Sequence, residues 1–232
     1  MNRLSILNQI IRKMNFKTYL EIGIAQGWLF SRVKVFSKFG VDPMGCAAWL
    51  EQKTNGTSSR CFKMTSDEFF LNFKRLLKKR KIDIAFVDGL HTYRQALRDV
   101  NHCLEHLVPR GFVLMHDCNP PSATIAAPVK SWEHAKRQGL LQWNRPWCGD
   151  VWKAVVHLRA TRKDLRIFVL DCDWGVALIT QGEPRSKINL TSKQVRALTY
   201  KDLAKSRKEL LDLRNPRYLY TFLDSYLKQV QY

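Results

Sequence analysis

Short runs of β-branched and other apolar residues alternate with longer stretches of helical periodicity through the first half of this 232-residue chain. A strand that is apolar on both faces, as in 82–88, is typical of the centre of a parallel sheet, because helices cover both sides of it. The alternation predicts an α/β fold of the doubly wound, Rossmann-like type, with a mostly parallel sheet and helices on both faces. The predicted strands are 18–22, 40–42, 60–64, 82–88 and 111–116, and the predicted helices are 28–38, 67–79 and 93–107.

The second half of the chain departs from this pattern. Residues 118–148 are rich in proline and aromatic side chains, which predicts a lid-like insertion. A helix at 149–161 precedes two strands at 165–170 and 174–180, and the three residues between these strands predict an antiparallel hairpin. We therefore expect one domain over 1–182, followed by a C-terminal helical extension over 183–232 that is broken near Asn215-Pro216.

Composition is that of an ordinary globular protein, with 45% hydrophobic and 25% charged residues. No apolar run reaches the roughly 18 residues that span a bilayer, and the charged N-terminal stretch lacks a secretory pattern. We expect a cytoplasmic protein. The six cysteines show no CxxC pair and no zinc-ligand spacing, which predicts free thiols rather than disulfides or a structural metal.

The formal net charge of +19 marks a basic protein and favours encounter with anionic partners, nucleic acid among them. Much of this charge lies in 74–81 and along the C-terminal helical stretch, where a solvated helix face is the simpler interpretation. The aromatic interleaving of an RNA-recognition motif is missing from the sequence. Charge alone therefore names no substrate.

A glycine turn, Glu21-Ile22-Gly23-Ile24-Ala25-Gln26-Gly27, lies between the first predicted strand and the next helix. Gly23 and Gly27 allow the backbone to approach a ligand closely, and a helix start offers free amide groups to a nucleotide-like ligand. Asp42 ends the next strand, where a carboxylate can accept hydrogen bonds from both ribose hydroxyls. These features suit a nicotinamide cofactor and S-adenosylmethionine equally well.

Further motifs favour S-adenosylmethionine over a nicotinamide cofactor. Val41-Asp42-Pro43, Phe86-Val87-Asp88-Gly89-Leu90-His91-Thr92-Tyr93, Leu107-Val108-Pro109-Arg110-Gly111 and His116-Asp117 follow the glycine turn in order. Together they resemble class I S-adenosylmethionine-dependent methyltransferases over roughly residues 16 to 180. The resemblance is to the branch that includes the methyltransferase 24 domain and macrocin O-methyltransferase-like enzymes, and it implies a seven-stranded sheet whose last strand is antiparallel.

The resemblance also implies roles for particular residues. Glu21, Gly23 and Gly27 would shape the pocket for the methionine and ribose parts of S-adenosylmethionine, and Asp42 would hold the ribose. Ser66 and Asp67 would neighbour the adenine, while Asp88 would lie beside the sulfonium group and the substrate. The sequence departs from many relatives at Ala25, where they carry a glycine.

Asp88 and Asp117 end two successive strands and are candidate ligands for Mg²⁺, which in catechol-type O-methyltransferases lowers the pKa of the attacking hydroxyl. Those enzymes commonly place asparagine directly after the second aspartate, whereas here Cys118 stands there and Asn119 follows. The sequence therefore does not identify the residue that would be the third metal ligand.

A hydroxyl nucleophile requires a base, and His91 and His116 are the candidates because each lies close in sequence to Asp88 or Asp117. We expect structural roles for the histidines in predicted helices, and packing for Tyr93. Asn119-Pro120-Pro121-Ser122 is similar to a motif of amino-methyltransferases, but it follows the wrong strand and lacks the final aromatic residue. A proline-stiffened loop is the better interpretation.

The sequence therefore predicts an S-adenosylmethionine-dependent methyltransferase that acts on a hydroxyl of a small molecule, with a sugar-like or polyhydroxylated acceptor as one option. Trp132, Trp143 and Trp147 are candidates to line the acceptor pocket or to pack as a lid. The alternatives are an RNA methyltransferase, a non-catalytic cofactor-binding module and, last, a dehydrogenase. Aromatic residues in the C-terminal helix suggest a homo-oligomer contact.

Overall fold

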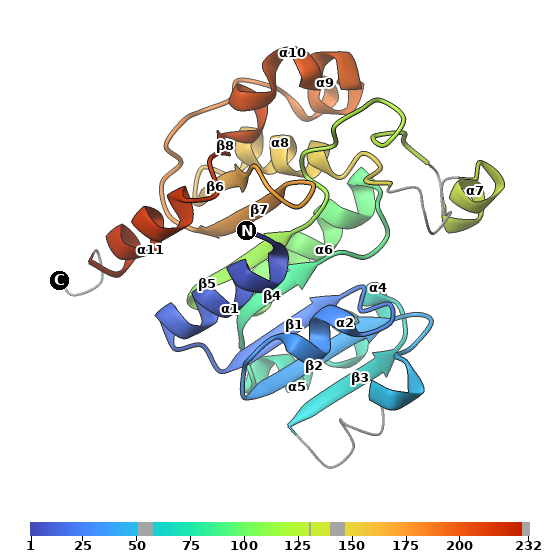
Figure 1. Ribbon diagram of the computed structural model, residues 1–232, viewed down its shortest axis with the longest axis vertical. Coiled ribbons are helices and arrows are strands. Elements are labelled where there is room, and N and C mark those ends of the chain that lie inside the picture. The colour runs from blue at the N-terminus through green and yellow to red at the C-terminus, as the bar shows by residue number, and fades with distance from the viewer. Residues whose placement is uncertain (51–57, 130, 140–146, 229–232) are drawn as a thin grey trace. The chain divides into compact units, whose positions relative to one another are not determined.

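The computed structural model describes residues 1–50, 58–129, 131–139 and 147–228 (Figure 1). The chain forms two compact units. Unit 1 comprises Met1–Gly89, Asp99–Leu114 and Pro216–Tyr232, and unit 2 comprises Leu90–Arg98 and Met115–Asn215. The chain passes between them at four points: at Gly89–Leu90, within helix α6 (Tyr93–His106), at the end of strand β5 (Leu107–Met115) and at Asn215–Pro216.

The sheet of unit 1 has the strand order β3-β2-β1-β4-β5. Strand β1 lies at its centre and pairs in parallel with β2 on one side and β4 on the other. Most residues of these three strands are buried, which agrees with their apolar sequences. The strands expected from the sequence are therefore confirmed, with bounds β1 (Thr18–Ile22), β2 (Ser37–Asp42), β3 (Ser59–Lys63) and β4 (Ile82–Val87).

Helices α1 (Arg3–Met14) and α11 (Tyr218–Lys228) come from opposite ends of the chain and pack together in unit 1. An ion pair joins Lys13 to Asp224 at 2.8 Å. Phe222 and Tyr226 are buried, and their rings contact Phe112 of β5. These two aromatic residues of α11 thus pack inside unit 1, whereas Tyr220 is 48% exposed. A homo-oligomer stays a prediction.

Two predicted helices of unit 1 have different bounds in the structure. Helix α2 (Trp28–Arg32) ends at Val33, which is extended with φ −65° and ψ 125°, and β2 already begins at Ser37. The predicted helix 67–79 is divided at Phe73 into α4 (Ser66–Asn72) and α5 (Lys74–Lys79). Phe73 leaves helical geometry and packs its ring against those of Phe62 and Phe69.

Unit 2 contains the strand order β7-β6-β8. The expected hairpin is confirmed, because β6 (Leu165–Leu170) and β7 (Val176–Gln181) pair antiparallel. Strand β8 (Leu213–Arg214) pairs in parallel with β6. The remaining elements are α7 (Trp132–Arg137), α8 (Trp152–Thr161), α9 (Ser192–Ala197) and α10 (Tyr200–Leu211).

The described residues contain eight strands, so the expected number of seven was wrong by one. The extra strand, β8, lies in the segment that the sequence assigned to linker and helices. Asp212 ends α10 in the left-handed region, with φ 45°, and turns the next two residues onto β6. Two residues are too few to show a strand period.

The fold is the predicted α/β Rossmann-like type, with mostly parallel strands and one antiparallel region. The domain boundary at residue 182 stays a prediction. The expected insertion at 118–148 contains α7, and residues 130 and 140–146 within it lie outside the described residues. All six cysteines are free thiols. Within the described ranges, no helix has both the length and the apolar character needed to cross a membrane.

Candidate functional site

The glycine turn of unit 1 follows β1 in a left-handed backbone conformation. Gly23, Ala25 and Gly27 have φ values of 86°, 44° and 75°. A Cβ atom on Gly23 would lie 2.2 Å from the carbonyl oxygen of Asp88, so the turn runs against the backbone at the end of β4. Only glycine fits there. Ala25 accepts a conformation that costs an alanine about 1 kcal/mol and that a glycine would adopt without this cost.

Asp42, the last residue of β2, faces this turn. Its Oδ2 accepts a hydrogen bond from the Ala25 amide at 2.9 Å, and its Oδ1 accepts one from the Met44 amide at 2.9 Å. The residue is 9% exposed. Two backbone amides therefore fix the carboxylate, and each oxygen keeps a second lone pair for a hydroxyl donor.

Glu21 is 2% exposed and lies on β1, just before the turn. Burial raises the pKa of its carboxyl to about 8, and the negative charge of Asp88 acts in the same direction. Tyr19 donates a hydrogen bond to Glu21 Oε2 at 2.5 Å and lowers that pKa, as do the charges of Lys38 and Arg3. Tyr19 was not among the candidate residues, although positions i and i+2 of a strand share one face.

Ser66 and Asp67 begin α4, whose N-cap is Thr65. Ser66 is buried, and its hydroxyl donates to Asp99 Oδ1 at 2.7 Å. This contact supplies a hydrogen-bond donor to the buried Asp99, a residue that no local sequence signal marks. The role of Ser66 and Asp67 beside an adenine stays a prediction.

Asp88 follows β4, and its backbone amide donates to the Ile22 carbonyl at 2.9 Å. Its carboxylate forms an ion pair with Arg3 Nη1 at 3.4 Å. Arg3 is the first residue of α1, far away in sequence, and it was not a candidate residue. A fixed guanidinium thus offsets the charge of the carboxylate that was predicted to lie beside the sulfonium group and to bind metal.

His91 lies in unit 2 and has a defined tautomer. Its Nδ1 is 2.7 Å from the Trp147 carbonyl oxygen and 3.2 Å from Asp117 Oδ2. Both neighbours are acceptors, so Nδ1 must carry the proton. In the neutral ring the basic lone pair is therefore on Nε2. A Cβ atom on Gly149 would lie 1.9 Å from the His91 carbonyl oxygen, so this glycine permits the close approach.

His116 is 4% exposed and lies between two carboxylates. Its Nδ1 is 3.2 Å from Asp117 Oδ1, and its Nε2 is 3.6 Å from Asp173 Oδ1. Cys148 donates through Sγ to Asp117 Oδ1 at 3.3 Å. The structure thus brings His91, His116 and Asp117 into one network. It adds Cys148 and Asp173, which no local sequence signal marks.

The other candidates have structural contacts. Tyr93 begins α6, and its hydroxyl is 2.7 Å from His157 Nδ1. The rings of His102 and His106 stack on Phe70. These contacts agree with the packing roles expected for them.

The insertion tryptophans are described only in part. Trp147 is buried, and its indole donates to the Ala127 carbonyl at 2.8 Å. Trp143 and the side chain of Trp132 lie outside the described residues. Asp88 belongs to unit 1, whereas His91, His116 and Asp117 belong to unit 2, so joint action of these residues stays a prediction.

Comparison with known proteins finds similarity to methyltransferases in part of the chain. Residues 20–118 match a family described as a methyltransferase domain. This match covers the glycine turn, Asp42, Asp88 and Asp117, and it confirms the resemblance to class I methyltransferases. Comparison with curated proteins gave no significant match.

Solved structures show the same fold at low sequence identity. A Podospora anserina methyltransferase, PaMTH1, bound to S-adenosylhomocysteine is 17% identical, with 78% of each chain covered and a TM-score of 0.54. A Bacillus cereus O-methyltransferase in complex with S-adenosylhomocysteine is 10% identical over 78% of this chain and 80% of that one, with a TM-score of 0.52. TomG, an O-methyltransferase from Streptomyces achromogenes involved in tomaymycin synthesis, was solved with S-adenosylmethionine. It is 13% identical over 77% of this chain and 79% of its own, with a TM-score of 0.52.

Proposed function

We propose that this protein is an S-adenosylmethionine-dependent O-methyltransferase that acts on a hydroxyl group of a small molecule. The observation that carries the proposal is the glycine turn packed against the end of β4, with Asp42 fixed by the amide of that turn, inside the region that matches a methyltransferase domain. Three structures of the same fold are methyltransferases, and each was solved with S-adenosylmethionine or S-adenosylhomocysteine.

The residues of unit 1 fit such a cofactor. The carboxylate of Asp42 has the acceptor chemistry that two adjacent ribose hydroxyls require, and backbone amides hold it in place. Gly23 and Gly27 permit the positive φ values of the turn, and the absence of their side chains leaves room for the Asp88 backbone and the Leu50 side chain. When bound, S-adenosylmethionine supplies a methyl group activated by the sulfonium charge. The proposed cofactor site also includes four further residues of unit 1: Glu21, Ser66, Asp67 and Asp88.

The residues of unit 2 suit deprotonation of an acceptor hydroxyl. Nε2 of His91 is the basic nitrogen, because the Trp147 carbonyl holds the proton on Nδ1. An acceptor hydroxyl at Nε2 would pass its proton to this nitrogen while its oxygen takes the methyl group, whose bond to the cofactor sulfur would break and leave S-adenosylhomocysteine. Asp117, 3.2 Å from Nδ1, stabilises the imidazolium that forms. His116 contacts the other oxygen of Asp117, and Asp173 contacts His116 in turn and extends the network.

Metal assistance by Mg²⁺ at Asp88 and Asp117 stays a prediction from the sequence. Carboxylate oxygens are suitable donors for Mg²⁺. In the structure, however, Arg3 pairs with Asp88, and histidine and cysteine side chains surround Asp117. The proposed proton transfer uses protein groups alone. A methyl-transfer assay with and without EDTA decides whether a divalent ion is also required.

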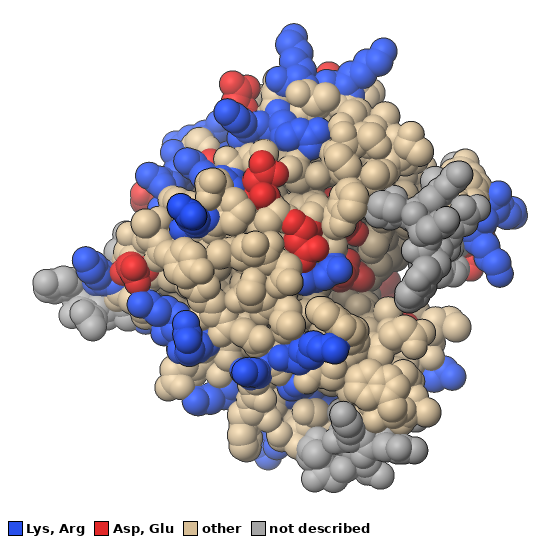
Figure 2. Space-filling view, viewed as in Figure 1, with Lys and Arg blue, Asp and Glu red and all other residues tan. Residues whose placement is uncertain are grey.

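An RNA methyltransferase is the second candidate, and the basic surface favours it. Exposed cations on α9 and α10 include Lys193, Arg196, Lys201 and Lys205. The face in Figure 2 carries Lys and Arg side chains in several separate groups. Separate groups suit a solvated surface as well as a nucleic-acid track, so this candidate ranks second.

Transfer of tritium from methyl-labelled S-adenosylmethionine tests the proposal. The acceptor set contains glycosides and polyhydroxylated aromatic compounds in one series, and total RNA in another. Labelling of a hydroxylated small molecule supports the proposal, whereas salt-sensitive labelling of RNA alone favours the second candidate. Cofactor binding without transfer to any acceptor in either series, unchanged by Asp88→Ala, contradicts both and indicates a binding module.

A further inference from the structure

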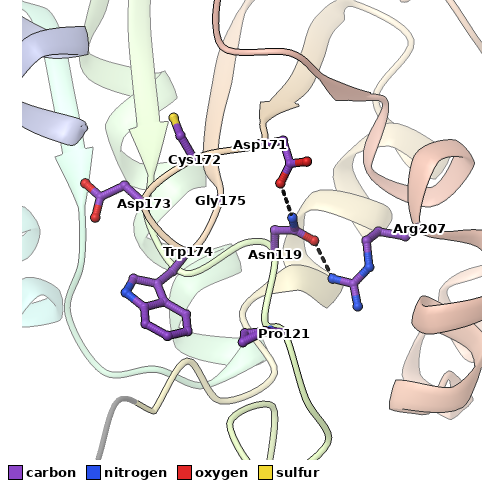
Figure 3. Close-up of a pocket in the computed structure, with 8 residues that line it drawn as sticks. All are labelled: Asn119, Pro121, Asp171, Cys172, Asp173, Trp174, Gly175 and Arg207. Carbon is purple, nitrogen blue, oxygen red and sulfur yellow. Dashed lines mark hydrogen bonds between the residues drawn. The ribbon is translucent and has the colours of Figure 1, made fainter. Parts of the chain in front are cut away.

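A cavity of about 470 Å³ lies within unit 2 (Figure 3). Its wall is built from the loop after β5, the turn between β6 and β7, and one residue of α10. This volume matches that of typical small-molecule sites, which are roughly 300–1,000 Å³. The residues that can recognise a ligand are Asn119, Asp171, Asp173, Trp174 and Arg207.

Hydrogen bonds fix the polar side of this cavity. Asn119 donates through Nδ2 to Asp171 Oδ1 at 2.9 Å, and its own Oδ1 accepts from Arg207 Nη1 (Figure 3). Arg207 also donates to the Pro120 carbonyl at 2.9 Å and to the Tyr200 hydroxyl at 3.1 Å. Each of the three side chains keeps further donor or acceptor capacity for a ligand. The array is therefore preorganised, which lowers the entropic cost of binding.

Trp174 supplies the apolar side. Its side chain is part of the cavity lining, although the residue remains 38% exposed. Gly175 lies against Asn119, where a Cβ atom would come within 2.4 Å of the Asn119 amide nitrogen. The backbone amide of Asn119 in turn donates to the Trp174 carbonyl at 2.7 Å. The indole and the polar array are thus tied together through the backbone.

The charges of the lining favour a neutral, polyhydroxylated ligand. Asp171 and Asp173 would repel a phosphate or carboxylate, and the guanidinium of Arg207 would repel an amine. Vicinal hydroxyls suit all of these groups, because a hydroxyl both donates to carboxylates and accepts from a guanidinium. The C–H face of a sugar ring stacks on an indole, which offers a large apolar surface.

One lining residue, Asp173, connects the cavity wall to the histidine network. Its Oδ1 is 3.6 Å from His116 Nε2. His116 contacts Asp117, which in turn contacts His91. All of these residues belong to unit 2. A ligand in the cavity therefore lies next to the Asp173 end of this network.

We propose that this cavity is the acceptor subsite and that it binds a neutral sugar ring, stacked on Trp174 and hydrogen-bonded to Asp171, Asn119 and Arg207. The inference rests on the proposed O-methyltransferase function, because it makes the ring part of the methylated substrate. It adds a substrate class and the residues that select it.

Saturation-transfer NMR on the full chain with S-adenosylhomocysteine tests this subsite. The probes are methyl glucoside, methyl mannoside, methyl rhamnoside and methyl xyloside, with spermidine and inorganic phosphate as charged probes. We expect millimolar binding of at least one glycoside, at least tenfold weaker binding in Trp174→Ala, and a smaller loss in Arg207→Lys. Phe36→Ala, at a residue that is 75% exposed in unit 1, is the matched control and leaves glycoside binding unchanged.

The outcomes separate the subsite from the function. Binding of S-adenosylhomocysteine without binding of any glycoside overturns the subsite alone, and so does preferential binding of spermidine or phosphate. Glycoside binding that Trp174→Ala leaves intact overturns the role of the indole. Glycoside binding lost in Trp174→Ala, in a chain that never binds S-adenosylhomocysteine, supports the sugar cavity and overturns the methyltransferase.

Discussion

The glycine turn of unit 1 and the histidine network of unit 2 depend on different kinds of contact. The turn is a backbone structure: Gly23 touches the Asp88 carbonyl region, and the amides of Ala25 and Met44 hold Asp42. The network is a side-chain structure, in which His91, Asp117 and His116 depend on one another. The difference suggests a division of labour, with unit 1 providing rigid cofactor binding and unit 2 providing the titratable groups for turnover.

The largest expected effect is that of Gly23→Ala. The new methyl group collides with backbone at the end of β4 and requires φ near +86°. We expect destabilisation of more than ~3 kcal/mol and loss of measurable S-adenosylhomocysteine binding. Gly182→Ala is the control, because Gly182 also has positive φ but its Cβ would meet nothing closer than 3.7 Å. It should cost about 1–2 kcal/mol and spare binding, as thermal unfolding and calorimetry can show.

Substitution in the network should spare binding and reduce turnover. We expect His91→Asn to lower kcat by ~100–1000-fold and to leave the Kd for S-adenosylhomocysteine unchanged. His157→Asn, which removes a histidine bonded to Tyr93, should retain most activity. The pH profile of kcat measures the role directly, since removal of the base abolishes its acidic limb. A His91 variant with wild-type kcat and an unaltered profile would remove this residue from the mechanism.

In contrast to His91→Asn, Asp42→Asn should act on cofactor binding. It should weaken S-adenosylhomocysteine binding by roughly 10–100-fold because a charged acceptor becomes neutral. Asp83→Asn is a matched control, since Asp83 also accepts from two backbone amides, those of Lys17 and Thr18, at the opposite end of β1. That variant should lose stability and keep its affinity. Equal loss of affinity in both variants would show that Asp42 acts only through folding.

The smallest effect is expected for Glu21→Gln. With a folded pKa of about 8, Glu21 keeps its proton at pH values where an unfolded glutamate has lost it. The stability from this group is therefore complete below pH ~4.5 and is lost as pH rises through about 8. Glu21→Gln should reduce the fall in unfolding free energy between pH 5 and 8 by roughly 3 kcal/mol, and it should change stability at pH 5 and cofactor affinity less than the variants above. Glu105→Gln, at an exposed position, should leave that slope unchanged.

The same pKa predicts proton release on cofactor binding. A sulfonium or ammonium group near Glu21 favours the ionised carboxylate. Calorimetry in buffers of different ionisation enthalpy should therefore show release of part of a proton in the wild type and less in Glu21→Gln. Equal proton release in both proteins would place the cationic end of the cofactor elsewhere.

The sequence predicted the backbone part of the candidate site better than the side-chain part. Glycines before a helix and an aspartate after a strand are local signals, so the turn and Asp42 were identified from residues close together in the chain. Arg3, Asp173 and Cys148 join their partners only through tertiary folding, and no local pattern marks them. Strand β8 was not predicted for a related reason. Two residues that follow a left-handed Asp212 are too few to show the alternating periodicity of a strand.

The most direct test of the central claim is calorimetric titration of the purified protein with S-adenosylhomocysteine, with NADH as the competing ligand, in wild type, Asp42→Asn and His91→Asn. The account predicts micromolar binding of S-adenosylhomocysteine and none of NADH, weakened by Asp42→Asn and unaffected by His91→Asn. Failure of S-adenosylhomocysteine to bind, or displacement of it by NADH, would contradict the account.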